Sequence, residues 1–201
     1  MPKAQADIVS AVIIVLLALS LTSSALIWGL PLIQKRQDSV LVARVSNIFN
    51  QDLPSKIGYV ASVGGSTTLS LDIDGIWVLN ETENSISFTF PSKVSDKGLN
   101  QWIGEGCPFT GQTGTVGIDK PSVVCVFVSQ TETGFNITYK IGFRELISSD
   151  GTKGYKIQLV KPSGGVSVST GKTLYISQKS VSQLPPVGQK ILIKTEIEIL
   201  L

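Results

Sequence analysis

The chain has 201 residues, with 17 basic and 15 acidic side chains and a formal net charge of +2. This balance, without a basic patch interleaved with aromatic residues, does not favour nucleic acid as a partner. The sequence contains no histidine, which excludes histidine-based catalytic triads and histidine metal ligands.

An uncharged apolar run extends from Ile8 to Ile33, close to the start of the chain. A bilayer core about 30 Å thick needs roughly 20 apolar residues of helix, and this run exceeds that length. We therefore expect a helix that crosses a membrane or enters the core of a filament. The alternative is a conventional signal peptide, for which Ser23–Ala25 offers a small-residue cleavage site. A buried core helix is disfavoured, because such helices are seldom apolar on every side over this length.

Lys3, Ala4 and Gln5 stand directly before this run. As far as Lys35, the chain resembles the class III signal peptide and helix of archaeal type IV pilin-like proteins. In that family a prepilin-type peptidase cuts after a Lys/Arg-Gly/Ala pair and leaves the apolar helix on the mature protein. The resemblance implies cleavage after Ala4, with Gln5 as the new N-terminus. Many members of the wider family have Glu at the fifth mature position, where this chain has Val9.

The sequence Trp28-Gly29-Leu30-Pro31 lies near the end of the apolar run. Proline removes a helix hydrogen bond, glycine loosens the helix, and tryptophan favours the bilayer interface. We expect the helix to leave the membrane near Trp28 and to break at Gly29 and Pro31. A proline kink within one longer helix is the alternative.

Helix signals resume after Leu32 and predict an amphipathic helical stalk over residues 34–65. Pro54 interrupts the pattern or opens a new first turn, and Gly64-Gly65 ends it. We expect the apolar stripe to pack on the chain's own β domain rather than on a neighbouring subunit, because a lone sheet needs a cover. The stripe consists of Ile33, Leu41, Val45, Ile48 and Phe49.

From Thr67 onward apolar residues alternate with polar ones, which is the period of a β-strand. Asp74-Gly75 separates two such runs and is a strong hairpin signal. Residues 67–90 are therefore predicted to form a three-stranded antiparallel meander, with its second turn at 80–84.

Residues 91–121 are rich in glycine, proline and polar residues and predict a long loop that contains Trp102, Cys107 and Phe109. Loops of this length are unusual unless they are tied down or functional, so this is the first place to look for a contact surface. A stapled loop without function is the alternative. Two cysteines in a chain with an export-type N-terminus favour a disulfide between Cys107 and Cys125, the latter in the apolar strand 123–129. Two buried free thiols would be the other outcome.

The C-terminal part of the chain contains further strand signals. Residues 135–143 and 155–160 predict a strand pair with Asp150-Gly151 near its turn, and residues 172–177 predict a shorter strand. Leu184-Pro185-Pro186 predicts a stiff connector. The alternating segment 190–201 predicts a final strand of the chain's own sheet, and strand addition to a neighbouring molecule is the alternative.

No nucleotide-binding glycine loop and no complete calcium loop occurs in the sequence, so neither a cofactor nor a bound metal is expected. With histidine absent as well, we do not expect an enzyme. Two N-glycosylation sequons begin at Asn80 and Asn136. Asn80 lies in a predicted turn and is the better acceptor, whereas Asn136 starts a strand.

Together these features predict a mainly β fold with an N-terminal α-helix. The expected parts are a leader at 1–4, a transmembrane or pilin-core helix at 5–33, the stalk at 34–65, and an extracellular antiparallel β-sandwich-like domain at 66–201. This domain is expected to have about seven or eight strands. The cysteines and the leader resemblance place it outside the cell, on a single-pass membrane protein or in an extracellular filament.

The expected function is that of a non-catalytic structural subunit or adhesin of a type IV pilus-like filament. The resemblance implies three partners: the lipid bilayer, the prepilin-type peptidase, and other pilin-like subunits that associate through the N-terminal helix. The alternative is a monomeric membrane-anchored binding domain or an accessory subunit of a secretion or motility machine.

Overall fold

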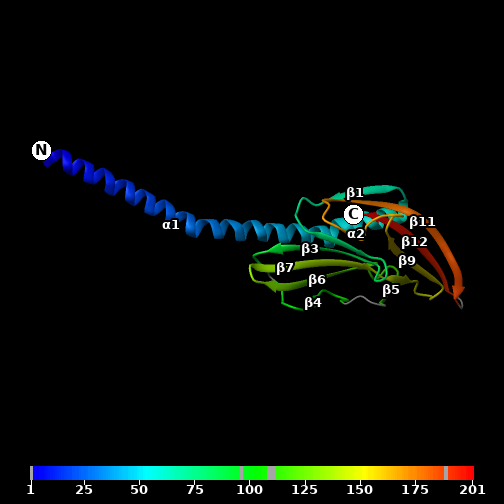
Figure 1. Ribbon diagram of the computed structural model, residues 1–201. Helices are drawn as coiled ribbons and strands as arrows, with labels where there is room; N and C mark the ends of the chain where they lie inside the picture. Colours follow the sequence, from blue (N-terminus) through cyan, green and yellow to red (C-terminus); the bar gives the residue numbers. More distant parts are fainter. Residues whose placement is uncertain (1, 96, 108–111, 188–189) are drawn as a thin grey trace. The chain divides into compact units, whose positions relative to one another are not determined.

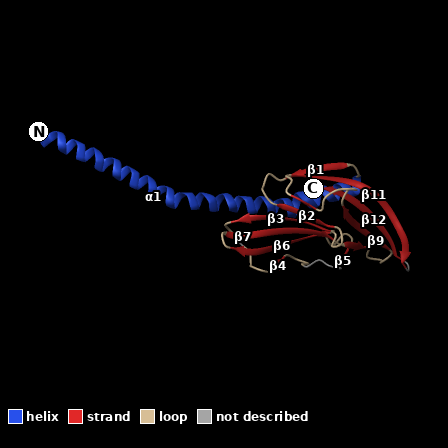
Figure 2. Ribbon diagram, viewed as in Figure 1, coloured by secondary structure: helices blue, strands red, loops and turns tan. Residues whose placement is uncertain are grey.

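Figure 1 shows the computed structural model, which describes residues 2–95, 97–107, 112–187 and 190–201. Met1, from the expected leader, and Phe109, from the expected loop, lie outside this described part. The chain divides into two compact units, Met1–Val40 and Leu41–Leu201. The first is helical, and the second combines the end of the helix with two β-sheets (Figure 2). The predicted fold class, mainly β with an N-terminal helix, is confirmed.

α1 (Pro2–Asn47) continues through a π-helical turn, η1 (Ile48–Asp52), into α2 (Leu53–Val63). The expected break at Gly29 and Pro31 is wrong, because α1 contains both residues and ends only at Asn47. Proline lacks its own N–H donor and so leaves only the carbonyl four residues earlier without its helix partner. The turns on either side carry the helix past this single defect, which is the alternative that the sequence left open.

The π-helical turn lies directly before Pro54, which occupies the first turn of α2. In a π turn an N–H donates to the carbonyl five residues earlier, as the Leu53 N–H does to the Ile48 carbonyl. The proline then falls where a missing N–H is tolerated. Gly64, with a φ of 86°, follows the last residue of α2, so the predicted end of the helix is confirmed.

The described part of Leu41–Leu201 contains twelve strands in two six-stranded sheets. This exceeds the expected number because several strands have only two or three residues. Sheet A has the order β1 (Ser66–Ser70), β11 (Thr173–Val187), β12 (Lys190–Leu200), β9 (Lys153–Val160), β8 (Glu145–Ile147), β5 (Thr113–Thr115). Sheet B has the order β10 (Val168–Ser169), β2 (Ile76–Asn80), β3 (Ser85–Ser92), β7 (Gly134–Phe143), β6 (Ser122–Thr131), β4 (Trp102–Ile103).

The predicted meander over residues 67–90 is wrong in its first turn. β1 pairs with β11 in sheet A, whereas β2 pairs with β3 in sheet B, so Asp74-Gly75 belongs to a crossing between the sheets. Leu71 and Ile73, just before this crossing, are buried, and their burial outweighs the local hairpin preference. Gly75 has a packing role instead, because a Cβ there would lie 2.3 Å from a ring carbon of Phe88. The second turn, between β2 and β3, is confirmed.

The predicted pairing of strands 135–143 and 155–160 is also wrong. β7 pairs with β3 and β6 in sheet B, whereas β9 pairs with β12 and β8 in sheet A. Asp150-Gly151 does lie in a turn, but the turn joins β9 to the short β8. The sequence pattern missed β8 because a strand of three residues is too short to show an alternation.

The last two strands form the longest pair in sheet A. The predicted connector Leu184-Pro185-Pro186 is part of β11, where the pairing with β12 is irregular between Leu184 and Val187. Prolines have no N–H for a regular ladder, so they fit at such an irregularity. β12 lies between β11 and β9. It is therefore a final strand of the chain's own sheet, as predicted, and has no free edge for strand addition.

The helix between Leu41 and Val63 contributes to the core of the second unit. Figure 1 shows β1 and β11 on one side of this segment and β3 and β7 on the other. The ring of Phe49 is 5.8 Å from that of Trp77 on β2 and 5.6 Å from that of Tyr139 on β7. The predicted packing of the stripe on the chain's own sheets is thus confirmed, except at Ile33, which is exposed. The buried helix residues are Val45, Ile48, Phe49, Leu53, Ile57 and Val60.

Candidate functional site

The apolar part of α1 is exposed along its whole described length. Every large apolar side chain from Val9 to Ile33 is at least half exposed, and Trp28 reaches 77%. The apolar run is about 39 Å long, because a helix rises about 1.5 Å per residue. It is therefore long and apolar enough to span a membrane. Thr22 does not interrupt this apolar surface, because its hydroxyl donates to the Ala18 carbonyl at 2.6 Å.

The expected leader junction lies at the start of the same helix. Lys3, Ala4 and Gln5 belong to the first turns of α1. Since α1 runs from this junction through Ile33 without a break, cleavage after Ala4 would leave the complete apolar helix on the mature chain.

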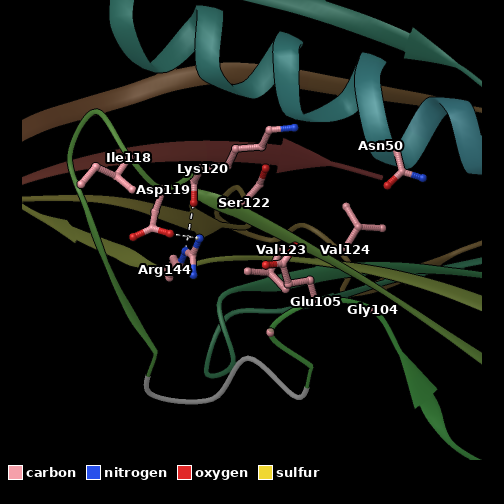
Figure 3. Close-up of a pocket in the computed structure, with 11 residues that line it drawn as sticks. Asn50, Gly104, Glu105, Ile118, Asp119, Lys120, Ser122, Val123, Val124 and Arg144 are labelled. Carbon is pink, nitrogen blue, oxygen red and sulfur yellow. Dashed lines mark hydrogen bonds and ion pairs between the residues drawn. The ribbon is translucent and has the colours of Figure 1, made fainter.

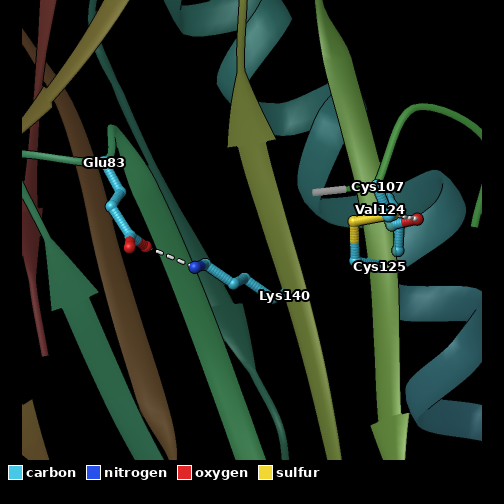
Figure 4. The surroundings of a disulfide bond; sticks show 5 residues. All are labelled: Glu83, Cys107, Val124, Cys125 and Lys140. Carbon is cyan, nitrogen blue, oxygen red and sulfur yellow. Dashed lines mark hydrogen bonds and ion pairs between the residues drawn. A yellow bond between two sulfur atoms is a disulfide. The ribbon is translucent and has the colours of Figure 1, made fainter. Parts of the chain in front are cut away.

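The loop after β3 is tied to sheet B. Cys107 is bonded to Cys125 of β6, with their Cα atoms 5.9 Å apart (Figure 4). Both predicted cysteines are therefore in one disulfide, and the alternative of two free thiols is excluded in this structure. Gly104 packs against the same strand, because a Cβ on it would lie 2.4 Å from the Val124 carbonyl oxygen. Two covalent or close contacts thus hold residues 104–107 on β6.

A pocket of about 480 Å³ lies beside this loop (Figure 3). Arg144 points toward it and is held by its own partners: Nε donates to the Lys120 carbonyl at 2.9 Å, and a terminal nitrogen lies 3.4 Å from Asp119. Asp119 in turn accepts from the Thr115 N–H at 2.7 Å. These contacts stiffen the β5–β6 connection. The pocket is lined by Asn50, Gly104, Glu105, Gly106, Ile118, Asp119, Lys120, Ser122, Val123, Val124 and Arg144.

This lining combines two basic and two acidic side chains with no nucleophile held against a base. Within the described ranges no group of three potential metal ligands comes together. The pocket therefore offers polar contacts, and its charges offset one another.

The two sequon asparagines differ in exposure. Asn80 ends β2 and is half-buried, and its side-chain oxygen accepts from the Glu83 N–H at 3.0 Å. Asn136 lies in β7 and is exposed. A glycan needs an accessible side-chain amide, so the structure makes Asn136 at least as accessible an acceptor as Asn80.

Asn84 is an important residue that the sequence reasoning missed. Its side chain is buried and donates to the carbonyls of Phe143, at 2.8 Å, and Ile157, at 2.6 Å. Its side-chain oxygen accepts from the Leu159 N–H at 2.7 Å. These partners lie on β7 of sheet B and on β9 of sheet A, so Asn84 joins the two sheets. Its φ is 53°, a region that asparagine tolerates better than most residues other than glycine. The only signal in the sequence was an asparagine at the end of the predicted turn 80–84.

Two further groups of charged side chains form ion pairs. Lys172 lies 2.8 Å from Asp72 and 3.3 Å from Asp74. The hydrogen bond to Lys172 lowers the pKa of Asp72, and the same contact raises the pKa of Lys172. On β12, the hydrogen bond from Lys194 lowers the pKa of Glu196. The Lys172 pairs are exposed and add little stability, and they indicate a solvated face rather than a reaction centre.

No protein-family model matches the chain, and neither the curated proteins nor the solved structures include a significant match.

Proposed function

We propose that this chain is a non-catalytic structural subunit or adhesin of an extracellular filament of the type IV pilus kind. The observation that carries the proposal is the exposed apolar helix Val9–Ile33, which continues without a break into the helix buried in the β domain. Exposing an apolar surface of this size to water is energetically unfavourable, so lipid or the helices of other subunits must cover it.

The N-terminal sequence supports the same proposal. Lys3-Ala4-Gln5 directly before the helix resembles a class III leader junction, and cleavage after Ala4 would give a mature chain that begins at Gln5. The peptidase that performs this cut and other pilin-like subunits are the partners that follow. Without neighbours the helix would remain in the bilayer, because hydrocarbon provides little hydrophobic drive for helix association.

Two features support an extracellular β domain. Disulfides persist in oxidising compartments, and Cys107–Cys125 is such a bond. Asn136 is an exposed sequon residue, which would be accessible to glycosylation outside the cell. We assign no catalysis to the chain, since the sequence lacks histidine and binding accounts for its features.

One observation favours a second candidate function, a monomeric membrane-anchored binding domain or an accessory subunit of a secretion or motility machine. Val9 stands where many pilins have Glu at the fifth mature position. A helix without that carboxylate lacks a polar group that would otherwise need a partner in a neighbouring subunit.

The test is N-terminal sequencing and intact mass of the protein from its native cells, with sedimentation of detergent-free supernatants. We expect a chain that begins at Gln5, and material that pellets as long assemblies. Ala4→Leu should retain residues 1–4 because of the bulk before the cut, whereas the matched variant Ala11→Leu should be trimmed normally.

A chain that begins at Leu26 would exclude both candidate functions and indicate a secreted protein. A chain that begins at Gln5 but stays in the membrane fraction would favour the anchored domain over the filament.

A further inference from the structure

The solvent-facing side of sheet B carries a row of side chains that lie directly opposite one another on adjacent strands, from Trp102 of β4 to Ile76 of β2. Trp102 of β4 faces Phe127 of β6, Phe127 faces Thr138 of β7, and Thr138 faces Thr89 of β3. Residues directly opposite in antiparallel strands share a face of the sheet. Ile76 lies opposite Thr89 at the end of this line and is 45% exposed. We call the four residues from Trp102 to Thr89 the Trp102 row. Their neighbours along the strands are buried in the core: Val126, Val128, Ile137, Tyr139, Phe88 and Phe90.

One end of the row is aromatic and the other is hydroxylic. The ring centroids of Trp102 and Phe127 are 5.2 Å apart, and Trp102 is 39% exposed. The hydroxyls of Thr138 and Thr89 lie 2.8 Å apart in a hydrogen bond. Four strands at the usual spacing make the row about 14 Å long. Tryptophan is enriched at recognition surfaces, because it combines a large apolar ring with a polar N–H group.

The position of Trp102 is fixed although β4 is short. The Asn100 N–H donates to the Val128 carbonyl at 2.8 Å on one side of Trp102. On the other side Gly104 packs on Val124, and the disulfide from Cys107 holds the chain to β6. The constrained loop that the sequence indicated as a contact surface therefore presents this ring in one place, which limits the entropy lost on binding.

The lysine beside the Trp102 ring is ion-paired within the chain. The amino group of Lys140 lies 5.5 Å from the centre of the Trp102 ring and is ion-paired with Glu83. Figure 4 shows the two side chains pointing toward each other. Nucleic acids and acidic polymers need unpaired cations, and an apolar partner would leave the threonine hydroxyls without water.

We propose that the Trp102 row is the binding surface of this adhesin for a neutral oligosaccharide. The C–H face of a sugar ring packs on the negative face of an aromatic ring, and its hydroxyls exchange hydrogen bonds with threonine hydroxyls. An uncharged ligand matches a ring whose neighbouring lysine is already paired with Glu83. The inference rests on the proposed function, of which it specifies the ligand class.

The full-length protein in detergent micelles is tested by affinity electrophoresis in gels that contain cellulose-, mannan- or chitin-derived neutral oligosaccharides, with heparin as an acidic probe. At least one neutral probe should retard the wild type.

Trp102→Ala should weaken that binding about tenfold, because one aromatic stacking contact is lost. Trp28→Ala is the matched control, since it removes another exposed tryptophan, which lies in α1 and not in the Trp102 row. Circular dichroism melting shows whether each variant is folded. If Trp102→Ala does not fold, Trp102→Phe is used in its place, and it should bind more weakly than the wild type but not lose binding completely.

Failure of every neutral probe to retard the wild type, equal weakening by Trp28→Ala, or binding only to heparin would overturn the proposal. Binding that appears only in Asn136→Gln would also do so, because the chain's own glycan would then cover the face. Sedimentation of Trp102→Ala keeps the two proposals apart: assemblies that still pellet leave the filament function intact when sugar binding fails, and sugar binding without assemblies contradicts only the filament.

Discussion

The two ends of one continuous helix differ in what covers them. Ile27, in α1, is 70% exposed, whereas Ile57, in α2, is fully buried between the strands of the second unit. The buried segment is amphipathic and carries one apolar stripe, while the segment from Val9 to Ile33 is apolar on every side.

This difference shows what each segment is built for. A stripe is sufficient where the chain's own sheets provide the cover and polar residues face away from them. All-round apolarity is required where the cover surrounds the helix, as lipid or a bundle of neighbouring helices does. The predictions below test what covers each segment and what stabilises the sheets around the buried one.

The largest effect is expected from two lysines in the exposed segment. Each lysine near the centre of a membrane-spanning helix makes insertion less favourable by about 2.5–3.5 kcal/mol, so Leu16→Lys with Leu17→Lys should cost about 5–7 kcal/mol. The double variant should become extractable from membranes by alkaline carbonate. Val40→Lys with Val63→Lys is the matched control, because both valines are exposed helix residues outside the apolar run and should not affect extraction. A double variant that stays as resistant as the wild type would show that the run is not embedded in lipid.

The reverse experiment removes a covered side chain. Phe49 is fully buried against Trp77 and Tyr139, so Phe49→Ala should reduce the free energy of unfolding by about 3–5 kcal/mol through lost burial and the cavity left behind. Ile27→Ala, in the exposed segment, should change it by less than about 0.5 kcal/mol. Urea unfolding in detergent, followed by near-ultraviolet circular dichroism, measures both. Equal effects would mean that the two segments are covered alike.

The sheets that cover the helix depend on Asn84. Asn84→Ala would leave two carbonyls and one N–H without their partner, and it would place alanine at a φ of 53°. We expect a loss of about 3 kcal/mol in the free energy of unfolding. Asn84→Gly separates the causes, since glycine accepts this φ but makes none of the three hydrogen bonds. If Asn84→Gly were as stable as the wild type, the side-chain hydrogen bonds would not hold the sheets together.

The same contrast explains which features the sequence could predict. The exposed helix and the buried stripe follow from local composition and period, and the disulfide follows from a count of two cysteines. Sheet membership was not predictable, because Asp74-Gly75 has the local form of a hairpin turn while the burial of Leu71 and Ile73 is a long-range effect. The Trp102 row was missed for a related reason, since its members come from four strands and meet only through the strand order.

The smallest effect concerns acid, and it separates the β domain from the exposed segment of α1. The Asp150 carboxylate in the β8–β9 turn accepts hydrogen bonds from the hydroxyls of Ser148, at 2.5 Å, and Thr152, at 2.8 Å, and from the Thr152 N–H. These bonds, that from Ser148 foremost, lower the pKa of Asp150 to about 2. A carboxyl whose pKa is lower in the folded state stabilises the fold above its unfolded value of 3.8 and loses that contribution as the pH falls toward 2. The melting temperature of the β domain should therefore fall a little more steeply across this window than it does in Asp150→Asn.

The helix from Val9 to Ile33 has no titratable side chain, so its helicity should stay constant over the same window. Identical pH profiles for the wild type and Asp150→Asn would show that the turn contributes nothing to acid sensitivity.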